Sequence, residues 1–317
     1  MGEFELIERY FSRPPRRAAL GVGDDCALFA PAAGQQLAVS SDLLVEGRHF
    51  LSTVLPERLG HKALAVNLSD LAACGAEPLG FTLALALPRA DEAFVAPLSQ
   101  GLLALAERHA VDLLGGDTTA GPLALCITVF GQVPPGQALL RSGARAGDTL
   151  WVSGRLGDAR LALEVFRGRC RLGGDDFEQV RLAMECPEPR VALGLGLRGI
   201  ASSAIDLSDG LLGDLGHVLR RSAVGARIEL AALPRSAVLA AQPHELQRTC
   251  LLHGGDDYEL LFTAAPALES RVLDAGARAG VAVTAIGRIE AEPGLRLLDE
   301  RGRLQAVQPQ GFDHFAA

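Results

Sequence analysis

Apolar runs of strand length alternate with helical segments along the whole chain, and this alternation limits the possible folds more than any other feature. The runs that predict strands are Gln36–Ser40, Phe81–Leu87, Val111–Leu114, Leu123–Gly131, Thr149–Ser153, Ser203–Ile205, Ala226–Leu230, Glu259–Thr263 and Val281–Ile289. The segments with helical periodicity are 3–12, Pro56–Cys74, Asp91–Ala110, two that begin near Gly157 and Pro189, Leu211–Arg221 and 266–279. Strands and helices mixed in this way predict an α/β or α+β fold.

Glycine and proline cluster once near the middle of the chain, in the segment Val133–Gln137. Such a cluster marks a break between packed elements. A chain of 317 residues is also long enough that two domains are more common than one. We therefore expect two lobes, residues 1–137 and residues 138–317.

The charge balance excludes several classes of protein. The chain has 30 basic and 38 acidic residues, a formal net charge of -8, which argues against binding of nucleic acid or anionic lipid by bulk attraction. Lys62 is the only lysine, and its surroundings match neither a Walker A loop nor a protein-kinase active site. If the protein handles phosphates, it does so without a P-loop.

The six cysteines are scattered and form no CxxC pair, so neither a zinc site nor a disulfide framework is expected. The first residues carry acids where a signal peptide carries bases, and no apolar run approaches the roughly 20 residues of a membrane helix. We expect a soluble, cytoplasmic protein.

Several aspartates lie directly beside predicted strands and are flanked by glycine, serine or threonine. The five segments are Gly21–Asp25, Ser40–Asp42, Gly115–Thr119, Asp206–Gly210 and Gly254–Glu259. Aspartate and hydroxyl oxygens, without histidine or cysteine, favour magnesium over zinc or copper. Glycines let the backbone approach phosphate oxygens, so the pattern indicates a magnesium-dependent phosphate site.

A sixth acid, Asp70, lies inside the helix predicted from Pro56, three residues after Asn67 on the same face. An acid on an apolar helix face is costly unless it is paired or bound to metal. The pair Asp206 and Asp209 has the same spacing.

Each motif also has a purely structural interpretation. A single Gly-Asp or Ser-Asp is usually a turn or a helix cap, and Asp209 suits a cap of the following helix. Within the Asp-Asp pairs, Asp25 and Asp257 are preferred to Asp24 and Asp256. His49 and Arg141 lie in predicted loops, where contact with an anionic substrate and a solvated surface role are equally compatible with the sequence.

Eight segments in order resemble thiamine-monophosphate kinase, a family of the aminoimidazole ribonucleotide synthetase-like superfamily. They are GVGDDCALF, SSDLLVEGRHF, KALAVNLSDLAACGAEP, LLGGDTT, RSGARAGD, SSAIDLSDGLLGDLGH, LLHGGDDYELLF and GFDHFA. The resemblance implies the two-lobed superfamily fold, with an N-terminal lobe for metal, ATP and dimerisation and a C-terminal lobe that completes the nucleotide and substrate site. It also implies ATP use without a P-loop.

The activity that the resemblance implies is phosphorylation of thiamine monophosphate to thiamine diphosphate by ATP, the last step of thiamine diphosphate biosynthesis. The transfer is direct and in line, with several Mg²⁺ ions. Because the acceptor is an ionised phosphate, positioning and charge neutralisation replace a general base. The resemblance further implies a homodimer.

The resemblance assigns roles residue by residue. The metal positions are Asp25, Ser40, Ser41, Asp42, Asp70, Asp117, Asp206 and Asp209, of which Asp42, Asp117 and Asp209 assist the transfer. The ATP positions are Gly116, Asp117, Arg141 and Ser208, and those for thiamine are His49, Asp257 and Phe312. The chain departs from the family at Asp256, where glutamate is common, and at Phe312, where tyrosine or tryptophan occurs.

Three other hypotheses compete with this one. The first is that the chain is another enzyme of the same superfamily. Against this, selenophosphate synthetase needs a reactive Cys or selenocysteine near the N-terminus, and the hydrogenase maturation factor needs a C-terminal cysteine. A magnesium-dependent phosphohydrolase uses the same kind of acids to activate water. A nucleotide or metal binder without turnover is the third.

Overall fold

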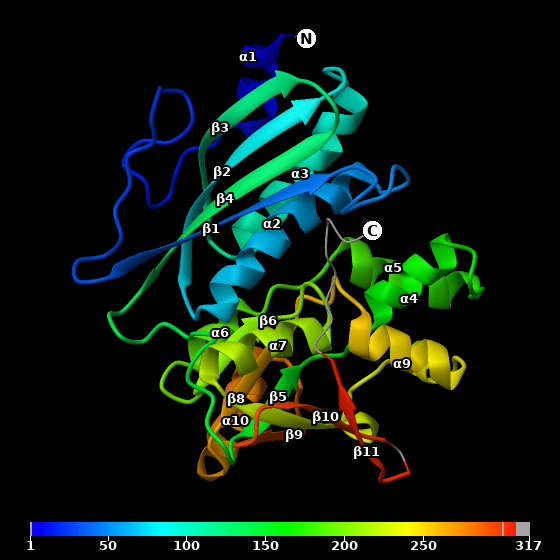
Figure 1. Cartoon of the computed structure of the whole chain (residues 1–317). Helices are drawn as coiled ribbons and strands as arrows, with labels where there is room; N and C mark the ends of the chain where they lie inside the picture. Colours follow the sequence, from blue (N-terminus) through cyan, green and yellow to red (C-terminus); the bar gives the residue numbers. More distant parts are fainter. Residues whose placement is uncertain (1, 300, 309–317) are drawn as a thin grey trace. The chain divides into compact units, whose positions relative to one another are not determined.

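The computed structural model describes residues 2–299 and 301–308, and its contacts divide the chain into two compact units. Unit 1 consists of Met1–Leu71 and Ala76–Gly136, and unit 2 of Ala72–Gly75 and Gln137–Ala317. Each unit has its own sheet and its own helices (Figure 1). The two are described separately below.

A four-stranded sheet forms the frame of unit 1, in the order β1-β4-β2-β3. Its strands are β1 (Gln36–Val45), β2 (Glu77–Leu87), β3 (Asp112–Ala120) and β4 (Ala124–Val133). Strand β4 runs antiparallel to both β1 and β2, and β2 and β3 are parallel. Strand β1 therefore lies at one edge of the sheet.

Two long helices, α2 (Pro56–Ala73) and α3 (Glu92–Arg108), cover one face of this sheet (Figure 1). Leu59, Leu64 and Leu68 of α2 are completely buried. Helix α3 begins where the Asp91 side chain accepts a hydrogen bond from the backbone N–H of Ala93, an ordinary N-cap. The N-terminal segment adds the short helix α1 (Glu3–Leu6) and the π-helical turn η1 (Ile7–Phe11).

Unit 2 is built on a seven-stranded sheet in the order β11-β10-β7-β9-β5-β8-β6. The strands are β5 (Thr149–Ser153), β6 (Ser203–Asp206), β7 (Gly225–Glu229), β8 (Leu260–Ala264), β9 (Val283–Glu290), β10 (Gly294–Leu298) and β11 (Leu304–Val307). All neighbouring pairs are antiparallel except β10 and β7. Strands β5, β6 and β8 are buried along their whole length, so they form the centre of the core.

The helices of unit 2 pack in two groups. Helix α4 packs on α5 and α9, α9 also packs on α7, and α6 packs on α10. Their bounds are α4 (Asp158–Phe166), α5 (Gly174–Glu185), α6 (Val191–Gly196), α7 (Leu211–Ser222), α8 (Ala237–Ala240), α9 (His244–His253) and α10 (Glu269–Ala279). Two 3-10 turns, η2 (Leu230–Ala232) and η3 (Pro266–Leu268), complete the unit. The first group and the sheet enclose one apolar core, to which α4, α7 and α9 contribute buried residues.

The predicted mixture of strands and helices is confirmed, and most predicted elements are present. Strand β5 has the predicted bounds, and α2 and α3 agree with prediction to within two residues at each end. Helix α5, helices α8 and α9, and strands β10 and β11 were not predicted. Two predicted strands are too short, because β1 and β3 continue through the Ser-Ser-Asp and Gly-Gly-Asp motifs that were expected to follow them.

No helix within the described part of the chain has the length and apolar character needed to cross a membrane.

Candidate functional site

Three predicted metal positions, Ser40, Ser41 and Asp42, lie inside strand β1 rather than after it. The strand stays extended because β1 pairs with β4 from Gln36, opposite Val133, to Val45, opposite Ala124. Side chains of a strand alternate between its faces, so Ser40 and Asp42 share one face and Ser41 lies on the other. The structure therefore does not bring all three side chains together, and the Ser41 hydroxyl donates to the Ile127 carbonyl across the sheet.

Helix α2 contacts the first of these faces through two polar residues. The Ser40 hydroxyl donates to Oδ2 of Asp70 at 2.5 Å, and the Asp42 backbone N–H donates to Oδ1 of Asn67 at 3.1 Å. Asn67 and Asp70 are three residues apart on one helix face, as the sequence predicts, and the structure shows that both contact β1. The otherwise costly acid on this helix is thus paired with a hydroxyl.

Gly116 and Asp117 lie in β3, where Gly116 is opposite Leu83 of the parallel strand β2. A Cβ atom on Gly116 would come within 1.8 Å of the Leu83 carbonyl oxygen, and the backbone there has a φ of +155°. Only glycine fits such a close approach at such a backbone angle. The glycine therefore lets β3 lie close to β2, and this close packing determines where the next residue, Asp117, lies.

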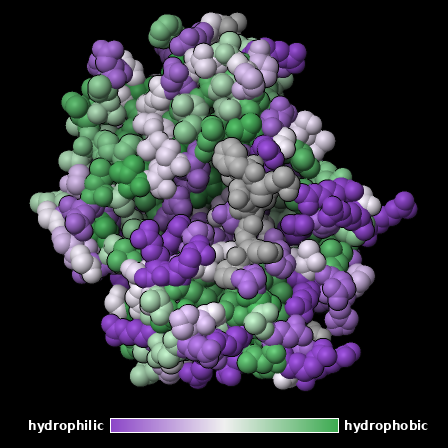
Figure 2. Space-filling model, in the orientation of Figure 1, coloured by the Kyte–Doolittle hydropathy of each residue, from purple (hydrophilic) through white to green (hydrophobic). Residues whose placement is uncertain are grey.

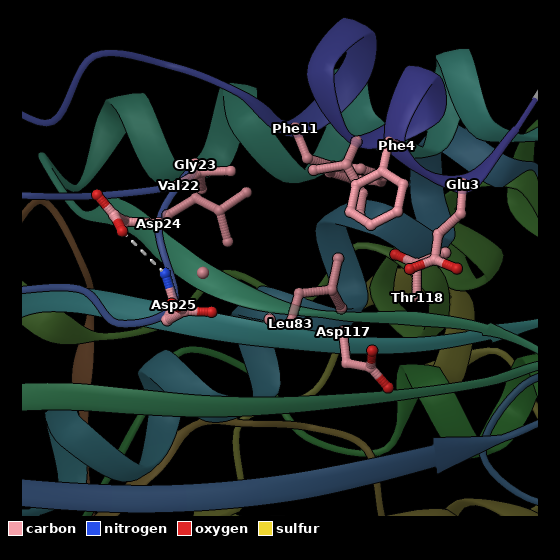
Figure 3. Close-up of a pocket in the computed structure, with 14 residues that line it drawn as sticks. Glu3, Phe4, Phe11, Val22, Gly23, Asp24, Asp25, Leu83, Asp117 and Thr118 are labelled. Carbon is pink, nitrogen blue, oxygen red and sulfur yellow. Dashed lines mark hydrogen bonds between the residues drawn. The ribbon is translucent and has the colours of Figure 1, made fainter.

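A cavity of about 520 Å³ in unit 1 is lined by Asp25, Gly116 and Asp117 together with Asp24. Figure 3 shows Phe4 and Phe11 of the N-terminal segment on one side of this cavity, and Asp24, Asp25 and Asp117 on other parts of its wall. The backbone N–H of Asp25 donates to the Asp24 side chain at 3.3 Å. One cavity thus combines carboxylates, glycine backbone and an apolar wall.

In unit 2, the predicted site residues Asp206, Ser208 and Asp209 lie at the end of β6 and in the loop before α7. The Asp209 backbone N–H donates to Oδ2 of Asp214, a buried residue in the first turn of α7, at 3.0 Å. Burial raises the pKa of the Asp214 carboxyl to about 8. The charges of Asp209 and Asp206 also raise this pKa and that of Arg141 lowers it, so these groups surround Asp214.

Asp214, which contacts a predicted metal position, is absent from the residues that the sequence predicts for the site. The sequence does carry a signal for it, because an acid three residues into an apolar helix is as costly as Asp70 is in α2.

The loop before β8 separates the two acids of its Asp-Asp pair. Both carboxylate oxygens of Asp257 accept a hydrogen bond from the backbone N–H of Gly157, at 2.9 and 3.0 Å, at the beginning of α4. Burial raises the pKa of Asp257 well above its ordinary value. Asp256 has a positive φ of 67°, its N–H donates to the Ser208 carbonyl, and its carboxylate accepts from the Tyr258 hydroxyl. The loop therefore lies against the Asp206–Asp209 segment.

His49 lies in the turn after β1, partly buried. Its ring Nδ1 accepts a hydrogen bond from the Val45 backbone N–H at 3.0 Å, so a neutral ring carries its proton on Nε2. The only lysine, Lys62, is buried in α2 and donates from Nζ to the His49 carbonyl at 3.1 Å. Lys62 thus holds this turn.

Phe312, predicted on the thiamine side, lies outside the residues that the structure describes.

Across residues 2–299 and 301–308, no three histidine, cysteine, aspartate or glutamate side chains gather into a ready-made metal centre. This agrees with the ligand habits of magnesium, which is commonly held by one or two carboxylates and completes its shell with water and substrate phosphates. The donors at hand are carboxylate, hydroxyl and carbonyl oxygens, including the Ser40–Asp70 pair and the carboxylates that line the cavity. The residues therefore fit Mg²⁺ bound together with a nucleotide.

Family models match both parts of the chain. The N-terminal domain of AIR synthase related protein matches residues 23–133, and the C-terminal domain of the same family matches residues 145–300. Among curated proteins, the thiamine-monophosphate kinase of Escherichia coli strain K12 is 45% identical, covering 99% of this chain and 98% of that protein. The enzyme of the same name from Haemophilus influenzae is 42% identical, with 99% and 98% covered.

Solved structures give the same relationship. The thiamine-monophosphate kinase of Stenotrophomonas maltophilia K279a superposes with a TM-score of 0.87 at 44% identity, covering 94% of this chain and 96% of that chain. AaThiL complexed with AMPPCP and TMP gives a TM-score of 0.78 at 29% identity, with 90% and 89% covered. The hydrogenase maturation protein HypE of E. coli, at 20% identity and a TM-score of 0.80 over 98% and 97%, shares the fold.

Proposed function

The chain belongs to the AIR synthase related family and, within it, to the thiamine-monophosphate kinases, and from this premise we propose how its residues carry out the reaction. The enzyme phosphorylates thiamine monophosphate to thiamine diphosphate with ATP as the phosphoryl donor. The observation that carries this conclusion is full-length similarity to enzymes of that name, one of them complexed with AMPPCP and TMP.

The acceptor in this reaction is a phosphate oxygen of thiamine monophosphate. That oxygen is already ionised near neutral pH, so no side chain has to remove a proton from it. What remains is to bring two anions together and to hold the attacking oxygen in line with the γ-phosphorus. The residues of the site therefore act by orientation and by charge.

Mg²⁺ bound at this site supplies the positive charge that lets carboxylates hold phosphates and that stabilises the transferring group. In unit 1 the residues that hold it in this proposal are Asp25, Ser40, Ser41, Asp42, Asp70 and Asp117, and in unit 2 they are Asp206 and Asp209. Ser41 takes part through its backbone carbonyl, because its side chain lies on the other face of β1. The support is the oxygen-only donor set and the pairing of Ser40 with Asp70.

ATP is assigned to Gly116, Asp117, Arg141 and Ser208. Gly116 brings a backbone without a side chain next to Asp117, which is the arrangement that suits a metal-bound phosphate. The apolar wall of the same cavity, with Phe4 and Phe11, suits the flat face of a nucleotide base. Arg141 adds a positive charge near Asp206 and Asp209.

Thiamine monophosphate is assigned to His49, Asp257 and Phe312. The neutral His49 ring presents an Nε2–H, a donor suited to a phosphate oxygen. Asp257 acts through the loop that it holds on Gly157, and Phe312 offers an aromatic face to the cationic thiazolium ring.

A cytoplasmic homodimer completes the proposal, with the dimer contact on unit 1. The face of β1 opposite Asp42 carries Leu37, Val39 and Leu43, which are 46%, 57% and 53% exposed. In Figure 2, hydrophobic residues, in green, are exposed among hydrophilic residues, in purple, on the visible side of the molecule. Replacement Leu43→Glu should shift the sedimentation profile from dimer to monomer, and an unchanged profile would place the contact elsewhere.

The reaction is tested with purified protein, ATP, MgCl2 and thiamine monophosphate. We expect thiamine diphosphate and ADP in equal amounts. Phosphate release without thiamine diphosphate would mean a phosphohydrolase, and nucleotide binding without either product a non-catalytic binder.

Two adjacent acids provide a matched test of the metal assignment. Asp25→Asn should raise the Mg²⁺ concentration for half-maximal rate by roughly tenfold or more, because it removes a charged ligand. Asp24→Asn, in the same cavity, should leave it within about twofold of the wild-type value. Equal effects of the two substitutions would remove Asp25 from the metal site.

A further inference from the structure

Asn67 connects helix α2 to the backbone of a predicted metal ligand. Its side chain is 1% exposed, and its Oδ1 accepts from the Asp42 N–H at 3.1 Å. Its Nδ2 donates to the Ala63 carbonyl, one turn earlier in the same helix, at 3.0 Å. Because the amide group is engaged on both sides, its oxygen is fixed toward Asp42.

Asp214 makes the same kind of contact in unit 2. It is 3% exposed in the first turn of α7, and its Oδ2 accepts from the Asp209 N–H at 3.0 Å. The loop between β6 and α7 includes Gly210, whose φ is +107°, directly after Asp209. Asp214 therefore fixes the backbone of the residue that precedes this glycine.

We propose that Asn67 and Asp214 are positioning residues, each of which aims the carboxylate of a metal-binding aspartate by accepting a hydrogen bond from that aspartate's backbone N–H. The proposal rests on the proposed function, since Asp42 and Asp209 enter it as metal ligands. The two contacts occur in different units and on unrelated elements, a strand in one and a loop in the other.

The physical reason lies in the demands of the ion. Magnesium requires nearly ideal octahedral geometry, and aspartate has a short side chain whose carboxylate follows its backbone closely. A backbone that turns by 10–20° moves the carboxylate out of the productive position. An acceptor rigidly mounted on a buried helix prevents this turn.

The direct readout is hydrogen exchange at two backbone amides in the metal-free protein, followed by NMR. In Asn67→Leu, which removes both hydrogen bonds at similar volume, we expect the Asp42 amide to exchange about tenfold faster. Amide exchange is also measured in Asn67→Ala, because this variant removes the same hydrogen bonds without adding any bulk. The control is Leu64→Ala on the same helix, which creates a cavity but leaves Asn67 in place, and whose Asp42 amide keeps its wild-type rate relative to Val45.

Asp214 allows the acceptor oxygen and the ionisable carboxyl to be separated. Asp214→Asn keeps an oxygen acceptor for the Asp209 N–H and removes the ionisable group, whereas Asp214→Leu removes both. We expect the Asp209 amide to exchange about tenfold faster in Asp214→Leu and within about twofold of wild type in Asp214→Asn.

The second readout is binding of MgCl2 in the presence of AMPPCP, measured by calorimetry. Asn67→Leu and Asp214→Leu should weaken it by about tenfold or more, whereas Leu64→Ala and Asp214→Asn should not. Unchanged amide exchange in both leucine variants would overturn the proposal. Equal weakening of Mg²⁺ binding in Asp214→Asn and Asp214→Leu would also overturn it, because that result would mean that Asp214 binds the ion directly. Failure of the wild type to form thiamine diphosphate would instead contradict the proposed function.

Discussion

The close approach of Gly116 to strand β2 predicts that Gly116→Ala disrupts both the sheet of unit 1 and the proposed nucleotide site. The added Cβ would lie 1.8 Å from the Leu83 carbonyl oxygen. An unstrained carbon–oxygen contact needs roughly 3.3 Å, so the two strands would have to separate locally by roughly 1.5 Å. A hydrogen bond stretched by that much is lost.

The loss of folding free energy has two parts, and the structure allows the magnitude of each to be estimated. Gly116 is exposed, but the added Cβ would overlap the Leu83 backbone, and relieving such an overlap costs about 1–3 kcal/mol. A backbone angle suited only to glycine adds about 1–3 kcal/mol. The sum, about 2–6 kcal/mol, corresponds to a fall in melting temperature of at least about 5 °C. Because Asp117 follows directly, a displacement of about 1 Å should also lower kcat/KM for ATP by roughly a hundredfold.

The assay is calorimetric melting together with steady-state kinetics, with Gly121→Ala as the matched control. A Cβ on Gly121, just after the same strand, would lie 3.6 Å from the Ala86 side chain, an ordinary contact, and Gly121 does not line the cavity. This control should keep the wild-type melting temperature and kinetics. Gly116→Ala with wild-type values, or a Gly121→Ala variant equally impaired, would refute the reasoning.

Three further predictions concern single side chains. Asp42→Asn should lose roughly a hundredfold or more in kcat with an unchanged circular dichroism spectrum, and full activity at low Mg²⁺ would remove Asp42 from the metal site. Phe312→Ala should raise KM for thiamine monophosphate roughly two- to thirtyfold and leave KM for ATP unchanged, and the reverse pattern would place Phe312 on the nucleotide side. Burial raises the pKa of Asp158 above its ordinary 3.8, so this group stabilises the fold at low pH and loses that contribution as pH rises through its folded value. Urea unfolding of Asp158→Asn and wild type should therefore show the variant gaining relative stability from pH 4 to pH 7, and a constant difference would contradict the assignment.

Long apolar segments made the long helices and the central strands predictable. Helix α2 is a long apolar segment whose residues are buried almost all round, and Pro56 marks its first turn, so the sequence alone places both ends to within a residue. Strand β5 is a short apolar run between turn residues and is buried along its whole length. For these elements the local preference and the tertiary environment agree.

The ends of β1 and β3 could not be predicted, because tertiary pairing overrides local preference there. Serine, aspartate and glycine are poor strand residues, and on their own they suggest that each strand ends at the motif. In the structure, Ser40 to Asp42 remain in register with Val129 to Ile127 of β4, and Gly116 remains opposite Leu83. The prediction that acids follow the strands was therefore wrong for these two motifs, and the consequence is chemical: residues within a strand alternate between faces, which separates Ser41 from Ser40 and Asp42.

The different roles of the neighbouring residues Asp256 and Asp257 show a second kind of information that the sequence alone does not provide. Asp256 and Asp257 have the same side chain and nearly the same neighbours, so the sequence ranks Asp257 above Asp256 only by its place in the pair. Their difference arises from Gly157, a hundred residues away, whose N–H at the beginning of α4 binds both oxygens of Asp257. Asp257 accepts a backbone N–H at the start of α4, and this contact holds the loop in which Asp256 has its positive φ beside Ser208. Asp257 thus holds the loop that contacts the Asp206–Asp209 segment, and it links the start of α4 to the segment where we propose that metal and nucleotide bind.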